Sequence, residues 1–270
     1  MKTNSFKRIA QFLGVTALLT LGSSAMAATT WNFSTCNGTA GNQASTNSGD
    51  FGNSWSCAGV TGSNKVTVSG WGGSSSATGF QTAFVSPQGG SGFGLASQYE
   101  GKSATSPDHA ADNDPVSLVP DLFVLKFDSA VALDKVTLGW NKNDADFTLM
   151  AYTGGTLTVK DKNASNLATG GGWSLVQQVG NQGVTQADAS TSVDVERTVN
   201  NGSNPVTSSW WLVSAYSASY NNSTALDTKL DYFKLFSVAS KDLPEPGSLA
   251  LFGLGLVGVL ASRRRSQKAA

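Results

Sequence analysis

Short apolar segments, rich in β-branched and aromatic residues and separated by polar turn residues, recur through the middle of the chain. In residues 65–71 apolar and polar positions alternate, as they do in a strand with one buried face. Further strands are expected at residues 122–127, 131–133, 136–140, 147–152, 157–160, 173–179, 192–199, 210–216 and 230–238. No long segment has the ~3.6-residue period of a helix. The pattern predicts an all-β fold, an antiparallel β-sandwich resembling a jelly roll.

The first residues of the chain have a different pattern, with basic residues followed by an apolar run at 9–21. Ala25 and Ala27 then form an A-x-A cleavage site for signal peptidase. This order predicts a secretory signal peptide over residues 1–28, formed by a short apolar helix and cut after Ala27 or Ala28. The alternative is a signal anchor that stays attached to the exported domain.

The last residues combine a proline-rich break, an uncharged run at 249–261 and a basic cluster. The prolines oppose a helix running through from upstream, so the break is expected to be an extended, accessible peptide. The uncharged run is shorter than the ~20 residues of a comfortable transmembrane helix, and it predicts a marginal span with the basic cluster on the cytoplasmic side. The residues that define the motif are Pro244, Glu245, Pro246, Arg263, Arg264 and Arg265.

This tail resembles the PEP-CTERM sorting signal of Gram-negative bacteria. The resemblance implies that the membrane enzyme exosortase recognises the motif and releases the protein from a transient inner-membrane anchor to the cell surface or extracellular matrix. Residues 106–152 also look like a segment of exosortase-dependent surface proteins. The expected organisation is therefore a signal peptide (1–28), an exported β-sandwich domain (29–240) and a sorting tail (241–270). The alternative for the tail is an ordinary, permanent membrane anchor.

Charge is distributed unevenly between the ends and the body of the chain. The full sequence holds 18 basic and 18 acidic residues, but seven of the basic ones lie in residues 1–28 and 249–270, which hold no acidic residue. Residues 29–248 therefore carry 11 basic and 18 acidic residues, a formal net charge of −7. An acidic body without a basic run argues against nucleic acid as a partner.

Cys36 and Cys57 are the only cysteines of the chain, and both lie in the exported part. An even number of cysteines in an oxidising compartment predicts a disulfide bond between them. Two free thiols or a metal-binding pair are the alternatives, and a pair of ligands without a nearby histidine makes a poor metal site.

The densest polar cluster of the sequence lies between Pro107 and Pro115, and a second acidic turn follows at residues 141–146. Carboxylate and amide oxygens are the ligands that Ca²⁺ prefers, which makes these two segments candidates for a calcium site. The alternative for the first segment is a turn whose Asp and Asn side chains cap their own backbone. For Asp144 and Asp146 the alternative is a solvated turn, which is the favoured interpretation of that pair. The only histidine, His109, is expected to hold the first loop by a hydrogen bond. The candidate ligands are Asp108, Asp112, Asn113, Asp114, Asp144 and Asp146.

The sequence holds no GxSxG, HExxH or Cys–His arrangement, which favours a non-catalytic protein. The resemblance to PEP-CTERM proteins adds an expected link to exopolysaccharide or biofilm. A carbohydrate-binding module is the first alternative, because tryptophans on jelly-roll modules stack against sugars. Strand alternation places one of Trp210 and Trp211 inward and the other outward, where it is the candidate sugar platform. A glycosidase is a weaker alternative, since paired carboxylates are present but their separation in space is not visible.

Overall fold

The computed structural model describes residues 28–36, 51–60, 64–75, 78–101, 109–113, 119–155, 157–180, 195–220, 226 and 229–241, together with Gly253 and Gly255. The expected signal peptide and sorting motif therefore lie almost wholly outside the described residues. One unit spans Ala28–Lys241, and the two chain ends form a second unit. Within the described part, no helix has both the length and the apolar composition needed to cross a bilayer.

The unit Ala28–Lys241 is built from strands that all pair in antiparallel fashion within one thirteen-stranded sheet. The prediction of an antiparallel all-β domain is confirmed, while the jelly-roll topology stays a prediction. The strands are β1 Thr30–Asn32, β2 Ser54–Ala58, β3 Lys65–Gly72, β4 Gln81–Pro87, β5 Phe93–Ala96, β6 Ala111–Asp112, β7 Leu122–Val131, β8 Leu133–Asn143, β9 Phe147–Tyr152, β10 Trp173–Val179, β11 Val195–Thr198, β12 Ser208–Ala215 and β13 Asp231–Ser240.

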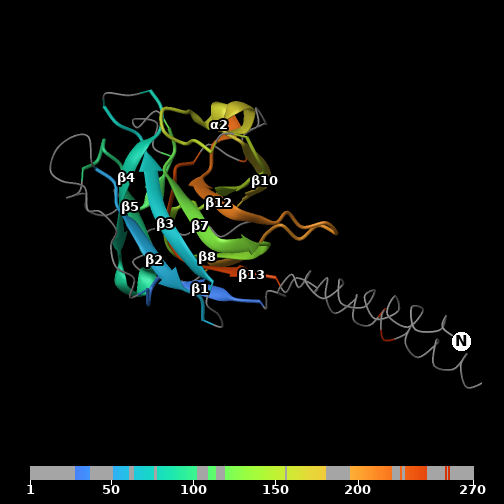
Figure 1. Ribbon diagram of the computed structural model, residues 1–270. Coiled ribbons are helices and arrows are strands. Elements are labelled where there is room, and N and C mark those ends of the chain that lie inside the picture. Colours follow the sequence, from blue (N-terminus) through green and yellow to red (C-terminus); the bar gives the residue numbers. More distant parts are fainter. Residues whose placement is uncertain are drawn as a thin grey trace, which may run out of the picture. The chain divides into compact units, whose positions relative to one another are not determined.

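The sheet folds into two layers, and β4 connects them (Figure 1). Residues 81–83 of β4 pair with β3, whereas residues 84–87 of the same strand pair with β5. The β7 layer contains the strands in the order β10-β9-β12-β7-β3, with β2 on β3. The β13 layer contains β5-β13-β8-β11, with β1 and β6 also paired to β13. Strand β13 is thus the centre of its layer.

Aromatic side chains fill the space between the layers. Phe123 and Phe127 alternate with polar or outward residues along β7 and are buried, as is Phe233 of β13. The ring centroids of Phe123 and Phe233 are 6.5 Å apart, and Trp31 of β1 contacts Phe127 at 4.6 Å. These edge and tilted contacts are the arrangements that aromatic quadrupoles favour, and they join the two layers into one core.

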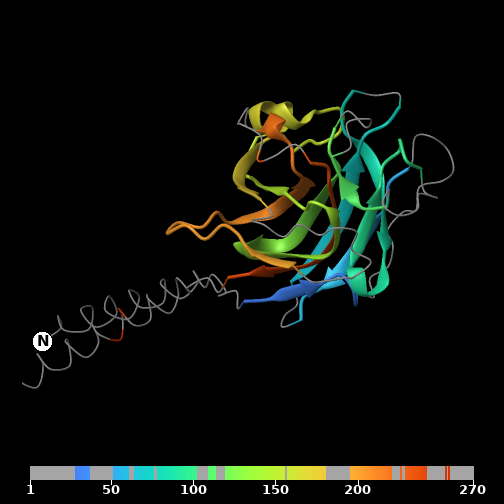
Figure 2. The ribbon, with the colours of Figure 1, turned by 180° about the vertical axis from the view of Figure 1, so that it is seen from behind.

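The β7 layer is buried on its outer face as well. Leu122 and Val124 point away from Phe123 and belong to a second cluster with Leu167 and Trp173. Leu167 comes from the helix α2 (Ala164–Gly170), which lies beside β10 in both views (Figures 1 and 2). Burial on both faces explains why 122–125 is a continuous apolar run.

Helix α2 was not expected from the sequence, and a strand expected at residues 157–160 is absent. The helix is too short to show a 3.6-residue period, although Asn163 caps it by accepting a hydrogen bond from the Asn166 amide at 2.9 Å. Residues 157–160 instead lead into a turn at Asp161, whose φ is 60°, and Val159 packs into the second cluster. The expectation of a strand at residues 157–160 is therefore wrong.

The expected disulfide bond between Cys36 and Cys57 is present, and the described residues contain no free cysteine. Cys57 lies in β2 of the β7 layer, and Cys36 follows β1, which pairs with β13. The bond therefore links the two layers of the sheet covalently.

Candidate functional site

Two groups of three carboxylates stand out among the described residues. The Glu100 trio consists of Glu100, Asp112 and Asp121. The Asp231 trio consists of Asp144, Asp146 and Asp231. In each trio, one oxygen from every residue lies within 4.8 Å of the others, and five of the six side chains are buried. Carboxylates this close repel one another unless a proton, a hydrogen-bond donor or a cation lies between them.

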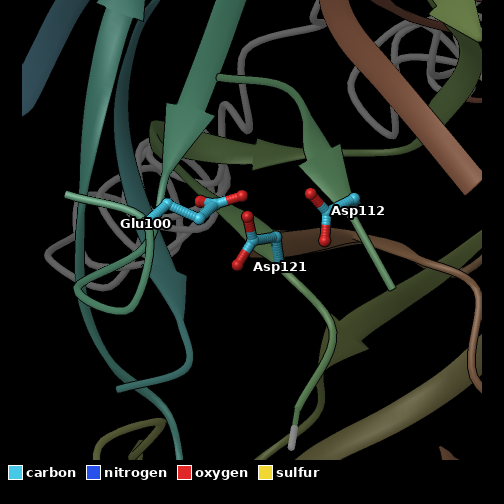
Figure 3. A group of neighbouring side chains, drawn as sticks. All are labelled: Glu100, Asp112 and Asp121. Carbon is cyan, nitrogen blue, oxygen red and sulfur yellow. The ribbon is translucent and has the colours of Figure 1, made fainter. Parts of the chain in front are cut away.

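The Glu100 trio is assembled from both layers of the sheet (Figure 3). Asp112 is in β6, which pairs with β13, and Asp121 directly precedes β7, while Glu100 lies in the turn after β5. The Asp121 amide donates to the Asp112 carbonyl at 2.7 Å, and this bond holds the two segments together. The Ser97 amide donates to Glu100 Oε2 at 2.7 Å and orients the glutamate.

Asp121 is the least satisfied member of this trio. Its side chain is 1 % exposed, and neither carboxylate oxygen has a hydrogen-bond partner among the described residues. Its backbone carbonyl, by contrast, accepts hydrogen bonds from the Ser214 hydroxyl at 3.0 Å and the Ala215 amide at 2.9 Å. The backbone is therefore fixed. In Figure 3 the Asp121 carboxylate points toward Glu100, and the Asp112 carboxylate points toward Asp121 from the other side.

Burial and mutual repulsion shift the acidity of this trio. Burial, followed by the nearby Asp112 carboxylate, raises the pKa of Glu100 to about 8. Burial, then the charges of Asp112 and Glu100, also raises the pKa of Asp121 well above its ordinary value. Both pKa values shift upward, as expected for buried carboxylates that lie near other negative charges.

The Asp231 trio has a different environment, because backbone and side-chain donors face its oxygens. The Asp146 amide donates to Asp231 Oδ1 at 2.8 Å, and the Asn113 side-chain amide donates to Asp231 Oδ2 at 2.5 Å. The Ala145 amide donates to Asp144 Oδ1 at 2.8 Å. Lys229 Nζ lies 4.0 Å from Asp144 Oδ2. This trio is a hydrogen-bonded junction between the turn before β9 and the start of β13.

The expected calcium ligands thus divide between the two trios. Asp112 belongs to the first trio and Asn113 contacts the second, because consecutive side chains of an extended segment point to opposite sides. Asp144 and Asp146 are 4 % and 2 % exposed, so the solvated-turn interpretation of this pair is wrong. Asp108 and Asp114 lie outside the described residues.

Sequence reasoning missed three members of the trios: Glu100, Asp121 and Asp231. A signal was present for Asp121, because alternation from Phe123 places it on the inward face of the chain entering β7. Asp231 similarly begins the last strand on a buried position. Nothing local marks Glu100, whose role depends on the turn after β5.

The other candidates occupy ordinary structural positions. The His109 carbonyl accepts a hydrogen bond from the Leu95 amide at 3.2 Å. Trp211 is fully buried, and its indole N–H donates to the Ser208 carbonyl at 3.0 Å. Trp210 is half-buried on the opposite face, with Lys126 Nζ 5.1 Å from its ring centroid. The alternation expected for this pair is confirmed, with Trp210 as the outward member.

The function of the tail follows from its match to a known motif. Residues 242–265 match the family model of the PEP-CTERM protein-sorting motif. The chain carries a PEP-CTERM sorting motif. The match includes the Pro244-Glu245-Pro246 break, the apolar run and all three arginines. PEP-CTERM motifs direct export and surface sorting by the exosortase system of Gram-negative bacteria, so exosortase is a processing partner of this chain. Among curated proteins, none matches the chain.

Proposed function

We propose that the chain is a non-catalytic protein of the cell surface or extracellular matrix, linked to exopolysaccharide or biofilm. The observation that carries the proposal is the PEP-CTERM motif at residues 242–265. In this proposal signal peptidase cuts after Ala27 or Ala28, and the apolar run holds the protein briefly in the inner membrane. Exosortase then cuts near Pro246 and releases the exported β-sandwich domain (29–240).

Several features support a non-catalytic role. Both cysteines are joined in the disulfide bond and supply no thiol nucleophile. The chain has a single histidine to serve as a general base. In the Glu100 trio, Asp112 and Asp121 are 3 % and 1 % exposed, which leaves a glycan no access to a pair of carboxylates there.

The test of sorting is the intact mass of the protein recovered from the surface and the medium. We expect a mass that starts near Ala28 and ends near Pro246, and a longer, membrane-bound form in a strain without exosortase. Replacing Pro244 and Pro246 by alanine is expected to give the longer form as well, whereas Pro87→Ala at an exposed position is not. A mature wild-type protein that keeps residues 249–270 in the membrane would make the tail a permanent anchor.

A carbohydrate-binding module is the second candidate, and the outward position of Trp210 favours it. The indole is half-buried, packs against the second cluster and has Lys126 Nζ over its ring, 5.1 Å from the ring centroid. In this proposal a sugar stacks on the exposed part of the indole. Pull-down on the host's own exopolysaccharide should then be lost in Trp210→Ala and retained in the half-buried Trp140→Ala. Equal retention by both variants removes this candidate, and release of reducing ends from the polymer would indicate a glycosidase.

A further inference from the structure

The strongest unexplained feature of the fold is a buried carboxylate without a partner inside the Glu100 trio. Asp121 has no hydrogen bond to either side-chain oxygen, and no described lysine, arginine or histidine forms an ion pair with it. A buried acceptor left without a donor destabilises the folded state, and a charged one does so more strongly. The surrounding chain nevertheless holds Asp121 in this position through three backbone hydrogen bonds.

Space for the carboxylate is provided by a glycine on the neighbouring strand. A Cβ atom on Gly72 of β3 would lie 2.1 Å from Asp121 Oδ1 and 2.8 Å from the Ser97 Cβ. Because any side chain at position 72 would fill this space, Gly72 lets Asp121 Oδ1 enter the interior next to Glu100 and Asp112. The position of Asp121 therefore depends on Gly72 at the end of β3 and on the pairing of β3 with β7.

We propose that Glu100, Asp112 and Asp121 bind one divalent cation, Ca²⁺, between the two layers of the sheet. Two oxygens bound to the same Ca²⁺ at ~2.4 Å can be at most ~4.8 Å apart. The three carboxylates meet this limit, since one oxygen of each lies within 4.8 Å of the others. The cation supplies the positive charge that the described surroundings of Asp121 lack.

The chemistry of the donors selects the metal. All three ligands are hard carboxylate oxygens, which suit Ca²⁺ and Mg²⁺, whereas Zn²⁺ in proteins is held mainly by nitrogen and sulfur. Mg²⁺ keeps several of its waters and demands octahedral geometry at ~2.1 Å. Ca²⁺ accepts irregular geometry and bidentate carboxylates, so a site formed by two buried aspartates and one half-buried glutamate favours Ca²⁺.

The Asp231 trio lacks these features and is not part of the proposal. Asp231 accepts hydrogen bonds on both oxygens, and Lys229 lies near Asp144. Donors already satisfy the oxygens that a cation would need. A hydrogen-bonded junction explains that trio without a ligand.

Ca²⁺ bound at the Glu100 trio would stabilise the exported domain, a role separate from the sorting of the protein. Asp112 belongs to a strand of the β13 layer and Asp121 to the entry of the β7 layer, so one cation would connect both layers and the turn that carries Glu100. This link would lie on a segment distinct from the Cys36–Cys57 disulfide bond. The exported domain would then be more stable in calcium-containing medium.

The experiment uses the protein as the host exports it, stripped with EDTA and titrated with CaCl₂ in a calorimeter. We expect one binding site with a dissociation constant of about 10⁻⁴–10⁻³ M, the range of extracellular calcium modules. The melting temperature is expected to rise with Ca²⁺ concentration, and MgCl₂ is expected to bind more weakly. Absence of both heat and thermal shift with CaCl₂ overturns the proposal.

Three isosteric variants locate the site. Asp121→Asn is expected to weaken Ca²⁺ binding by roughly tenfold or more, because one of three ligand charges is lost. It should still fold in EDTA, since the amide can donate to Glu100 or Asp112. Asp128→Asn, at an exposed position of β7, and Asp144→Asn in the Asp231 trio are expected to bind Ca²⁺ as the wild type does. Wild-type affinity in Asp121→Asn, or loss of binding in Asp144→Asn alone, contradicts the assignment.

Discussion

Gly72 and Asp121 lie so close together that a methyl group on the glycine would overlap the aspartate. The Cβ position of Gly72 is 2.1 Å from Asp121 Oδ1, well inside any van der Waals contact. The two residues are brought together by the pairing of β3 with β7, in which Trp71 lies opposite Leu122. Gly72 is the last residue of β3, and its lack of a side chain leaves the space that the Asp121 carboxylate occupies.

Gly72→Ala tests this relationship directly. We expect a loss of about 1–3 kcal/mol in the free energy of unfolding, because the new methyl group must displace the Asp121 carboxylate or the strand. Urea unfolding measures the loss. Gly90→Ala is the matched control, since nothing lies within 4 Å of its Cβ position. Equal stability of the Gly72 and Gly90 variants would contradict the packing described.

The metal-free protein should lose stability as the pH rises. The folded-state pKa of Glu100 is raised from 4.5 to about 8, mainly by burial and then by Asp112. A raised pKa means that the folded state holds its proton more tightly, so the stabilisation is complete below 4.5 and is lost as the pH rises through about 8. The other titratable groups near Glu100 are Asp112 and Asp121, and Tyr220 lies near Asp121.

Melting temperatures recorded in EDTA between these two pH values measure the effect. The decrease is expected to be smaller in Glu100→Gln, which removes the titrating group and keeps its shape. A wild-type melting temperature that stays level or rises over this interval would show that the carboxylates are compensated in some other way.

The disulfide bond should contribute strongly to stability, because it joins segments of different layers. A loop of about twenty residues closed by a disulfide is worth ~3 kcal/mol through restriction of the unfolded chain. We expect the double variant Cys36→Ser with Cys57→Ser to unfold at a correspondingly lower urea concentration. Its midpoint should not change on addition of a reductant, whereas the wild-type midpoint should fall to a similar value.

Asn113 should stabilise the Asp231 trio, because it both donates to Asp231 Oδ2 and accepts from the Asp231 amide, at 2.5 and 2.8 Å. Asn113→Ala leaves a buried charge with one donor fewer, and a loss of about 1.5–3 kcal/mol is expected. Asn201→Ala, at an exposed position, is the control and should change stability little. Urea denaturation measures the free energy of unfolding of both variants, and the values are compared where the dependence on urea concentration is the same.

Much of the strand pattern could be predicted from local sequence, and the errors have physical causes. Residues 147–152 and 173–179 coincide with β9 and β10, because each is a β-rich segment bounded by turn residues. The expected strand at 157–160 is absent: Val159 is buried as a member of the cluster that also contains Leu167 of α2 and Trp173, and not on the face of a strand. Short segments of this kind contain too little periodicity to separate a strand from a turn.

The candidate site was predictable only in part. Asp112, Asn113, Asp144 and Asp146 were recognised because they cluster in sequence. Glu100 and Asp121 were missed because they join Asp112 only after β5, β6 and β7 are placed, which depends on the pairing of β6 with β13.

The sequence by itself determined the sorting motif, the antiparallel β class and the disulfide pairing. The motif is a short contiguous segment, the class follows from strand periodicity, and two cysteines allow one pairing. Only the tertiary structure decided which carboxylates meet, that Asp112 and Asn113 serve different trios, and that Asp121 is buried without a donor. Those facts depend on contacts between residues far apart in the chain, such as Asn113 with Asp231, whose geometry is set by the folding of one sheet into two layers.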